Sequence, residues 1–330
     1  MKLLINEGVR RDKWTNLLEN SQYSNPFHTE SFYNFYNSIE EFSADVFALE
    51  ENDQYTALVV VTIQKELGVK GYFSRRGIIY AGPVFTNNSE STSTALLKGV
   101  FNYYRKKLIY IESRNNFDYS AFKNHFGKLG FNYVPWLNFH LNTKELASMK
   151  KVMSSSKLRQ IKKSIKNGAH WAEAKSEKEI KYFYAILSDL YKNKVKKPLF
   201  PEEFFIEFFR KNVGKCLLVY KGNTVIGGII CPILKNKIIY EMYVCGLDQE
   251  YKHLYPSSMA TWAAMEYAVQ NNIALFDFMG AGSPDEDYGV REFKSRFGGE
   301  QVEHGRFMKI INPFLFKIGS IGVKVLAKIK

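Results

Sequence analysis

The sequence has few residues of the kinds that form cross-links and metal centres. Its three cysteines, Cys216, Cys231 and Cys245, fall on separate strand-like segments without metal-ligand spacing. They are interpreted as buried free thiols, with a catalytic cysteine as the alternative. The six histidines are scattered singly along the chain, at His28, His125, His140, His170, His253 and His304. Spacing therefore supports neither a zinc site nor a nucleophile–histidine pair, and we expect no metal.

Long hydrophobic runs are also missing. The first residues, MKLLINEGVRRDKW, contain no apolar stretch of signal-peptide length. No segment approaches the roughly 18 apolar residues of a membrane-spanning helix. The expected compartment is therefore the cytoplasm. The chain is nevertheless 45% hydrophobic and 15% aromatic over 330 residues, which excludes disorder and predicts about two domains.

The net charge of +13 is concentrated in two segments. Seven basic residues lie between Lys150 and Lys166, and no acidic residue follows before Glu173. Six more follow Glu303, again without an acidic residue. These two segments account for the whole excess and leave 33 basic and 33 acidic side chains elsewhere. The pattern predicts two local anion-seeking surfaces on an otherwise neutral protein.

Helices and strands alternate in both halves of the sequence. In the first half, strands at 44–51 and 54–65 flank a turn at Asn52-Asp53, and the segment YVPWLNFHLN reads as the last strand. In the second, Ser154 can cap a helix that Asn167-Gly168 ends. Helices at about 176–193 and 201–211, three meandering strands at 215–220, 224–234 and 237–246, a helix at 256–269 and a strand at 273–280 follow. We expect an N-terminal lobe at 1–149, a C-terminal lobe at 150–310 and a tail at 311–330.

This order of elements resembles the acyltransferase fold of the GNAT N-acetyltransferases, and the first half offers a degenerate version of it. The fold class predicted by the resemblance is α/β (α+β), with two tandem GNAT-like lobes and mixed, largely antiparallel sheets. The two halves share no residue-level repeat, so the duplication rests on topology.

The stretch YGVREFKSRFGGE contains Gly289, Phe293, Lys294 and Phe297-Gly298-Gly299 in that order. By this stretch above all, the sequence from about residue 150 resembles the Fem family of bacterial aminoacyltransferases, which build peptidoglycan interpeptide bridges from aminoacyl-tRNA. Residues 154–168 and 255–282 also match, as does GPVF at 82–85. One departure is Glu112-Ser113-Arg114, where relatives carry Asp-Pro; Glu112 is the candidate for the family's N-terminal catalytic carboxylate.

Acyl transfer to an amine requires a deprotonated nucleophile and a stabilised tetrahedral intermediate. Lys294 resembles the family lysine that contacts the nucleotide-sugar substrate, and we expect it to bind a phosphate or steady the oxyanion, with Arg291 or Arg296 in support. A solvated cationic loop is the alternative. These cations follow a glycine-rich turn that includes Gly280, where a ligand can approach the backbone.

Asp277 lies on a strand and has two interpretations. It accepts the proton of the attacking ammonium, or it orders the following glycine turn, and the second is favoured. Tyr243, Tyr255 and Tyr288 are expected at the same end of the sheet, where substrate contact and aromatic packing explain them about equally well.

The loop at 247–256 bears on the donor. Acetyl-CoA enzymes of the GNAT fold bind pyrophosphate with a glycine-rich loop that opens the next helix. The loop here, Leu247 to Pro256, contains no glycine. It therefore disfavours coenzyme A and favours aminoacyl-tRNA as donor co-substrate, with no other cofactor. The alternative function is that of a GNAT-type N-acyltransferase that uses acyl-CoA on a sugar or lipid amine. A third interpretation is a non-catalytic protein that binds a membrane surface or RNA.

The two basic segments differ in kind. In the helix at 154–166, spacing places Leu158, Ile161 and Ile165 inward and five cations outward as a tRNA-binding face: Lys157, Arg159, Lys162, Lys163 and Lys166. A soluble interdomain helix is the alternative.

In the tail, Lys317, Lys324 and Lys328 line one side of an amphipathic helix. This pattern is typical of an anchor on an anionic bilayer, with a docked C-terminal helix as the alternative. We therefore expect a monomeric cytoplasmic enzyme, peripheral on the inner face of the plasma membrane. Its acceptor is a peptidoglycan precursor, either nucleotide-linked or lipid-linked.

Overall fold

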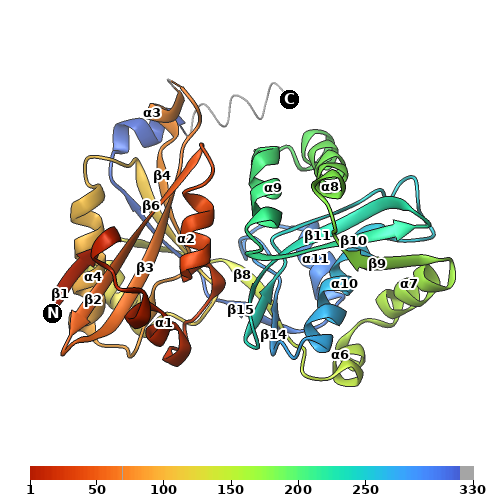
Figure 1. The fold of residues 1–330 in the computed structure, drawn as a ribbon, viewed down its shortest axis with the longest axis horizontal. Coiled ribbons are helices and arrows are strands. Elements are labelled where there is room, and N and C mark those ends of the chain that lie inside the picture. The colour runs from red at the N-terminus through yellow and green to blue at the C-terminus, as the bar shows by residue number, and fades with distance from the viewer. Residues whose placement is uncertain (69, 320–330) are drawn as a thin grey trace. The chain divides into compact units, whose positions relative to one another are not determined.

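The computed structural model describes residues 1–68 and 70–319, which form two compact units, each built on a mixed sheet (Figure 1). Unit 1 comprises Met1–Trp136 together with the segment that begins at Glu303, and unit 2 comprises Leu137–Val302. The predicted mixed, largely antiparallel sheets are confirmed in both units.

The sheet of unit 1 has the strand order β1-β2-β3-β4-β6-β16-β7, and β5 pairs with β3. Only β4 and β6 are parallel among the strand pairs described in this sheet. The turn predicted between β2 and β3 is present, with positive φ at Asn52 and Asp53, residue types that tolerate this conformation. The strands are β1 Lys2–Ile5, β2 Phe42–Glu51, β3 Gln54–Gln64, β4 Arg76–Ala81, β5 Val84–Phe85, β6 Tyr110–Asn115, β7 Asn132–Val134 and β16 Arg306–Ile310. The helices are α1 Arg11–Asn20, α2 Glu30–Tyr36, α3 Lys70–Ser74, α4 Glu90–Tyr104 and α5 Lys123–Lys128, with 3-10 turns at Asn6–Gly8, Pro26–His28 and Ser120–Phe122.

The sheet of unit 2 has the order β15-β8-β14-β12-β11-β10-β9, and β13 pairs with β11. Here β12 and β14 are parallel, whereas β8–β14, β12–β11, β13–β11, β11–β10 and β10–β9 are antiparallel. The strands are β8 Leu137–Asn142, β9 Ala169–Glu173, β10 Gly214–Lys221, β11 Thr224–Leu234, β12 Ile238–Tyr240, β13 Tyr243–Gly246, β14 Leu275–Asp277 and β15 Glu300–Glu303. The helices are α6 Leu146–Val152, α7 Ser155–Lys166, α8 Glu177–Leu190, a π-helical turn at Tyr191–Val195, α9 Glu202–Arg210, α10 Pro256–Gln270 and α11 Gly289–Ser295.

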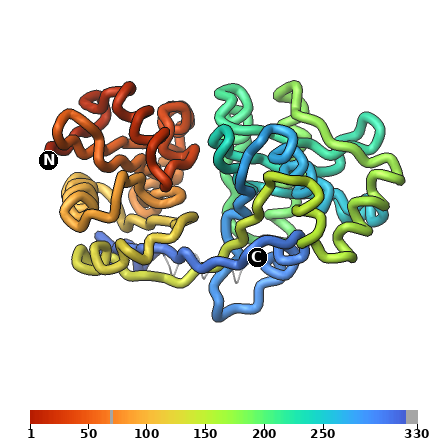
Figure 2. Tube along the Cα trace, turned by 90° about the horizontal axis from the view of Figure 1, so that it is seen from below, coloured from red at the N-terminus to blue at the C-terminus, as the bar shows by residue number. Residues whose placement is uncertain are grey.

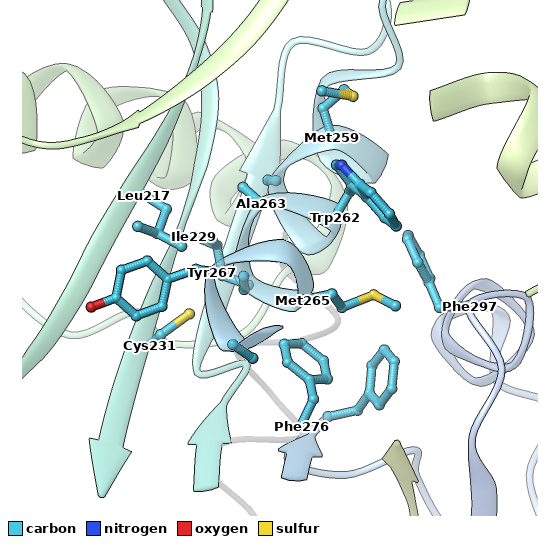
Figure 3. Packing of buried hydrophobic residues seen from close by; sticks show 14 of the residues in the cluster. Leu217, Ile229, Cys231, Met259, Trp262, Ala263, Met265, Tyr267, Phe276 and Phe297 are labelled. Carbon is cyan, nitrogen blue, oxygen red and sulfur yellow. The ribbon is translucent and has the colours of Figure 1, made fainter. Parts of the chain in front are cut away.

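Helix α10 is the centre of the unit 2 core. It is buried on nearly every side because it packs between the sheet and helix α7, with Phe297 of the segment after β14 in the same cluster. Figure 3 shows Trp262 and Met265 of this helix directed toward Phe297 and Phe276. The FGG element of the family motif is therefore part of the core through Phe297, while Gly298 and Gly299 adopt positive φ.

The unit boundaries differ from the expected 149/150 and 310/311. The predicted last strand of the first lobe breaks at Pro135, which lacks a backbone N–H. Its first part, β7, stays in unit 1, and its second part, β8, pairs with β14 of unit 2. The chain later returns to unit 1, where β16 lies between β6 and β7 (Figure 2, dark blue). These boundaries are set by the pairing of β8 and β16 with strands that are distant in the sequence. The composition of the sequence does not reveal such pairing.

Candidate active site

The sheet of unit 2 splits at Glu241 and Met242, which interrupt the strand predicted at 237–246. Before the interruption β12 pairs with β14; after it, within the described chain, β13 pairs with β11 alone. The link across this point is a hydrogen bond of 2.9 Å from the Glu241 N–H to the Asp277 carbonyl oxygen. Beyond this hydrogen bond, within the described chain, strand pairing no longer joins the segment that contains β13 to the segment that contains β14.

Ionisable side chains are buried at this split. Lys294 Nζ lies 3.3 Å from Glu241 Oε1, and the Thr261 hydroxyl donates to Glu241 Oε2 at 2.9 Å. Glu241 is 3% exposed, and burial raises its pKa although the Lys294 charge and these hydrogen bonds act in the opposite direction. A carboxylate and an ammonium group therefore share a site of low solvent access.

Lys294 extends from α11 to the backbone that follows β14. It donates to the carbonyl oxygens of Phe278 and Gly280, the latter at 3.0 Å. The side chain is 8% exposed, so a solvated cationic loop does not describe it. Lys294 carries a fixed positive charge beside Gly280, which has a positive φ and lacks a side chain.

Asp277 is fully buried and orders the turn after β14. Its Oδ1 accepts hydrogen bonds from the Met279 N–H at 2.6 Å and from Asn138 Nδ2 at 2.8 Å. Its Oδ2 lies 3.0 Å from His140 Nε2. This arrangement matches the favoured interpretation of Asp277. Burial acts to lower the pKa of His140, but the charge and hydrogen bond of Asp277 outweigh it and the net pKa is raised.

The two predicted supporting arginines have different surroundings. Arg291 holds the glycine-rich loop, because its Nε donates to the Ala281 carbonyl oxygen at 2.9 Å and its Nη2 donates to the Ser283 carbonyl oxygen. Arg296 pairs with Glu292 one helical turn away and its side chain is about half exposed. Arg291 is thus fixed in the loop, and Arg296 is accessible.

The three predicted tyrosines are on separate segments. Tyr243 packs among aromatic side chains of α9, with its ring centroid 5.1 Å from that of Phe205. Tyr255 precedes α10 with a φ of 44°. Tyr288 immediately precedes α11, is 37% exposed and packs beside Gly282. Packing accounts for Tyr243, whereas Tyr288 presents accessible aromatic surface.

Glu112 lies on β6 of unit 1, whereas Asp277 and Lys294 lie in unit 2. Its carboxylate forms two ion pairs: Oε2 lies 2.8 Å from Arg114 Nε, and Oε1 lies 2.9 Å from Arg306 Nη1. Burial acts to raise the pKa of Glu112, but the two guanidinium groups outweigh it and the pKa is lowered. A lowered pKa makes this carboxylate a weaker proton acceptor.

Helix α7 begins and ends as predicted, with Ser154 as its N-cap and Gly168 in a left-handed conformation after it. Arg159, Lys162, Lys163 and Lys166 are exposed, as expected. Two expectations are wrong: Ile165 is 53% exposed and Lys157 is only 4% exposed. The inward face is centred on Lys157, Ile161 and Ser164, because α7 packs against the polar start of α10. The Ser164 hydroxyl donates to the carbonyl oxygen of Leu254, just before α10, and Lys157 Nζ donates to the Ser258 hydroxyl in its first turn.

The N-terminus of α10 already holds a carboxylate. Asp248, in the glycine-free loop, accepts from the Ser257 N–H at 3.2 Å and from the Ser257 hydroxyl at 2.5 Å. Gly246 and Gly227 pack against Pro256 and Ser257, so the backbone is close here. The first turn of α10 is thus capped by the protein's own acid.

The tail is described only to residue 319, so Lys324 and Lys328 lie outside the described residues. Residues 313–319 are helical, with Leu315 buried, Phe316 edge-on to Tyr110 and Lys317 exposed. Phe314 is 73% exposed. The beginning of the tail is therefore docked on unit 1.

Three further features concern the whole described chain. Cys216, Cys231 and Cys245 are buried free thiols whose pKa values burial raises, which matches the favoured interpretation of the cysteines. Within residues 1–68 and 70–319, no group of three His, Cys, Asp or Glu side chains is arranged to hold a metal ion. No helix in the same ranges is both long and apolar enough to cross a membrane.

Sequence reasoning missed Asn138, His140, Glu241 and Thr261. Glu241 had a signal, since it is the single acidic residue within the largely apolar run KIIYEMYVCG. His140 and Asn138 alternate on β8 and therefore share one face, but β8 was assigned to the first lobe. Their approach to Asp277 follows from the β8–β14 pairing.

Comparison with known proteins gives a family match over part of the chain and a fold. Residues 221–322 match the model of the FemAB family. No curated protein matches the sequence. Among solved structures, the chain is similar to the crystal structure of FemX, with a TM-score of 0.73 and 11% identity over 96% of this chain and 99% of that one.

Two other structures share the fold at lower similarity. L-PGS from Bacillus licheniformis has a TM-score of 0.58 and 8% identity over 96% of this chain and 97% of that one. A tandem GNAT protein from the clavulanic acid biosynthesis pathway has a TM-score of 0.58 and 7% identity over 94% and 99%. These matches confirm the resemblance predicted from the sequence: the chain is similar to the FemAB family over part of its sequence and to FemX in fold, and it is built from two GNAT-like lobes.

Proposed function

We propose that the protein is a Fem-like aminoacyltransferase that moves an amino acid from aminoacyl-tRNA to the stem-peptide amine of a peptidoglycan precursor. The acceptor is nucleotide-linked or lipid-linked, and the amphipathic pattern of the tail favours the lipid-linked form. The family match over residues 221–322 supports the reaction class.

The observation that carries the choice of donor is Asp248 at the N-terminus of α10. In acyl-CoA enzymes this helix end faces the pyrophosphate, and backbone N–H groups stabilise its charge. Here the Asp248 carboxylate accepts from Ser257 at that position. A pyrophosphate placed there would meet a like charge and compete for the same donors, so coenzyme A is disfavoured.

The chemistry is assigned to the split in the sheet of unit 2. The acceptor amine attacks the ester carbonyl of the aminoacyl-tRNA, a C–N bond forms, and the ester C–O bond breaks. The amine gives up one proton and the leaving oxygen takes up one, so that the tRNA is released with a free hydroxyl. Lys294 supplies positive charge for the tetrahedral oxyanion by exchanging its bond with the Gly280 carbonyl oxygen for one with the substrate. Asp277 is a positioning residue, because hydrogen bonds from Asn138, Met279 and His140 engage both of its oxygens.

The tRNA is bound through its phosphates by the exposed cations of α7, with Lys150 and Lys151 of α6 nearby in sequence. Four exposed cations remain on α7 after Lys157 is removed from the predicted set. The described part of α7 carries no acidic residue to neutralise them.

Transfer assays with radiolabelled aminoacyl-tRNA and with acyl-CoA test the proposal. We expect product from aminoacyl-tRNA only, and loss of at least about 100-fold in rate for Lys294→Ala. Lys178→Ala, on the surface of α8, is the matched control and should retain activity. Product from acyl-CoA alone would support the alternative N-acyltransferase, and full activity of Lys294→Ala would remove Lys294 from the mechanism.

A further inference from the structure

A second charged cluster lies in unit 1, on one face of the sheet. Arg114 on β6 is directly opposite Arg306 on β16, and Glu112 lies two residues before Arg114 on the same strand. Since alternate residues of a strand point to the same face, all three side chains emerge together. The opposite face carries Ile111 and Phe307, which belong to the hydrophobic core.

The cluster has more positive than negative charge. Two guanidinium groups share the single carboxylate of Glu112, each through a different oxygen. In the described residues, no other carboxylate lies within ion-pair distance of either arginine. Burial and repulsion from Arg114 lower the pKa of Arg306 to about 10, although Glu112 acts in the opposite direction. One positive charge is thus left without a counter-ion among residues 1–68 and 70–319.

The two guanidinium groups are held in place and remain accessible. Arg306 stacks on Trp136, with its guanidinium carbon 3.7 Å from the ring centroid, and Arg114 lies 5.7 Å from the centroid of Tyr80. The side chains of Arg114 and Arg306 are 33% and 22% exposed. Arg114 uses Nε and Arg306 uses Nη1 toward Glu112, and their other guanidinium N–H groups have no acceptor among the described residues.

We propose that Arg114 and Arg306 form a binding site for an oxyanion, a carboxylate or phosphate group of a ligand. Paired arginines offer planar, forked donors that match the geometry of either group. Glu112 sets the spacing of the two arginines and weakens binding by occupying one donor of each. The inference concerns binding to unit 1 and does not depend on the identity of the acyl donor.

Isothermal titration of the full chain at low salt tests the site, with inorganic pyrophosphate and N-acetylalanine as probes. We expect Arg306→Gln to weaken binding of at least one probe about tenfold, and Glu112→Gln to strengthen it by about the same factor, because a competing charge is removed. Arg105→Gln, an exposed arginine after α4, is the matched control and should not change the affinity. Preference for pyrophosphate assigns the site to a phosphate, and preference for N-acetylalanine assigns it to a peptide carboxylate.

The opposite signs of the two changes separate a binding site from a structural ion pair. If Glu112→Gln and Arg306→Gln both leave the affinity for both probes at the wild-type value, the proposal is overturned. Circular dichroism checks folding. If Arg306→Gln does not fold, Arg306→Lys and Arg114→Lys keep the charge and remove the fork; unchanged affinity in both would equally overturn the proposal.

Discussion

Replacement of Lys157 by methionine tests how a buried cation affects stability. Lys157 Nζ donates to Ser258 Oγ at 2.9 Å and lies over the rings of Phe293 and Phe297, at 4.3 and 4.7 Å from their centroids. Within the described residues no carboxylate pairs with it. Burial lowers the pKa of Lys157 from 10.5 to about 8, with Arg296 acting in the same direction.

The magnitude follows from that pKa. The lowering of the Lys157 pKa from 10.5 to about 8 corresponds to a loss of about 3 kcal/mol in the free energy of unfolding at pH 7, where the buried ammonium is charged. Methionine has a similar length and no charge, and its sulfur suits an aromatic environment. It loses the hydrogen bond to Ser258, which costs about 1 kcal/mol. Lys157→Met should therefore stabilise the protein by about 2 kcal/mol at pH 7.

The pH dependence gives the sign of the effect. Between pH 8 and 10.5 the unfolded chain keeps a proton that folded Lys157 has lost, so wild-type stability rises with pH across this window. Above pH 10.5 the lysine is neutral in both states. The advantage of the variant should therefore disappear there.

Urea unfolding of both proteins at pH 7 and above pH 10.5 measures these differences. Lys162→Met, an exposed residue of the same helix, is the matched control and should change stability by less than about 0.5 kcal/mol. Destabilisation of Lys157→Met by more than about 1 kcal/mol at pH 7 would refute the reasoning, since it would mean that the aromatic rings and Ser258 satisfy the charge fully.

Three further predictions concern tRNA binding, acid stability and the tail. Lys162→Glu/Lys163→Glu should weaken tRNA binding in a filter assay and reduce the salt slope, whereas Lys157→Met should leave affinity unchanged; affinity that survives the double change would exclude the α7 surface. His28 is fully buried between the Val60 N–H and the Gly82 carbonyl oxygen, and burial lowers its pKa from 6.5 to about 4, so stability should fall by about 3 kcal/mol as pH falls through that window. Equilibrium unfolding should show a flatter profile for His28→Gln, and an unchanged profile would contradict the assignment. Deletion of residues 320–330, which spares the packed Leu315 and Phe316, should release the protein from anionic vesicles in a sedimentation assay; unaltered partitioning would remove the membrane role.

The helix at 155–166 shows how far sequence patterns reach. Ser154 and Gly168 were identified from their residue types, because caps depend on chemistry within one helical turn. The predicted buried face is displaced by about one residue from the observed one. The prediction used the spacing of apolar residues, which selects Leu158 and Ile165 and does not select the polar residues Lys157 and Ser164. Those two polar side chains face inward because their partners, Ser258 and the Leu254 carbonyl oxygen, lie at the start of another helix.

The candidate site was only half visible for a related reason. Lys294 and Asp277 lie in motifs shared with a family, and their residue types suggested chemistry. Glu241 and His140 lie in segments that read as ordinary strands, and only the break between β12 and β13 and the pairing of β8 with β14 bring them to the same place. Strand pairing depends on contacts across more than 100 residues, which local periodicity does not record.

The sequence by itself determined the features that depend on near neighbours: the caps, the turns, the order of elements, the FGG motif and the two segments with excess positive charge. Tertiary structure decided which of those charges are solvated and which are buried. Lys157 and Lys163 are equivalent in the sequence, yet one is enclosed by Phe293 and Phe297 and the other is exposed. The reason is that the electrostatic free energy of a charge is set by desolvation and by partners within a few ångströms, and the fold alone assembles these from distant parts of the chain.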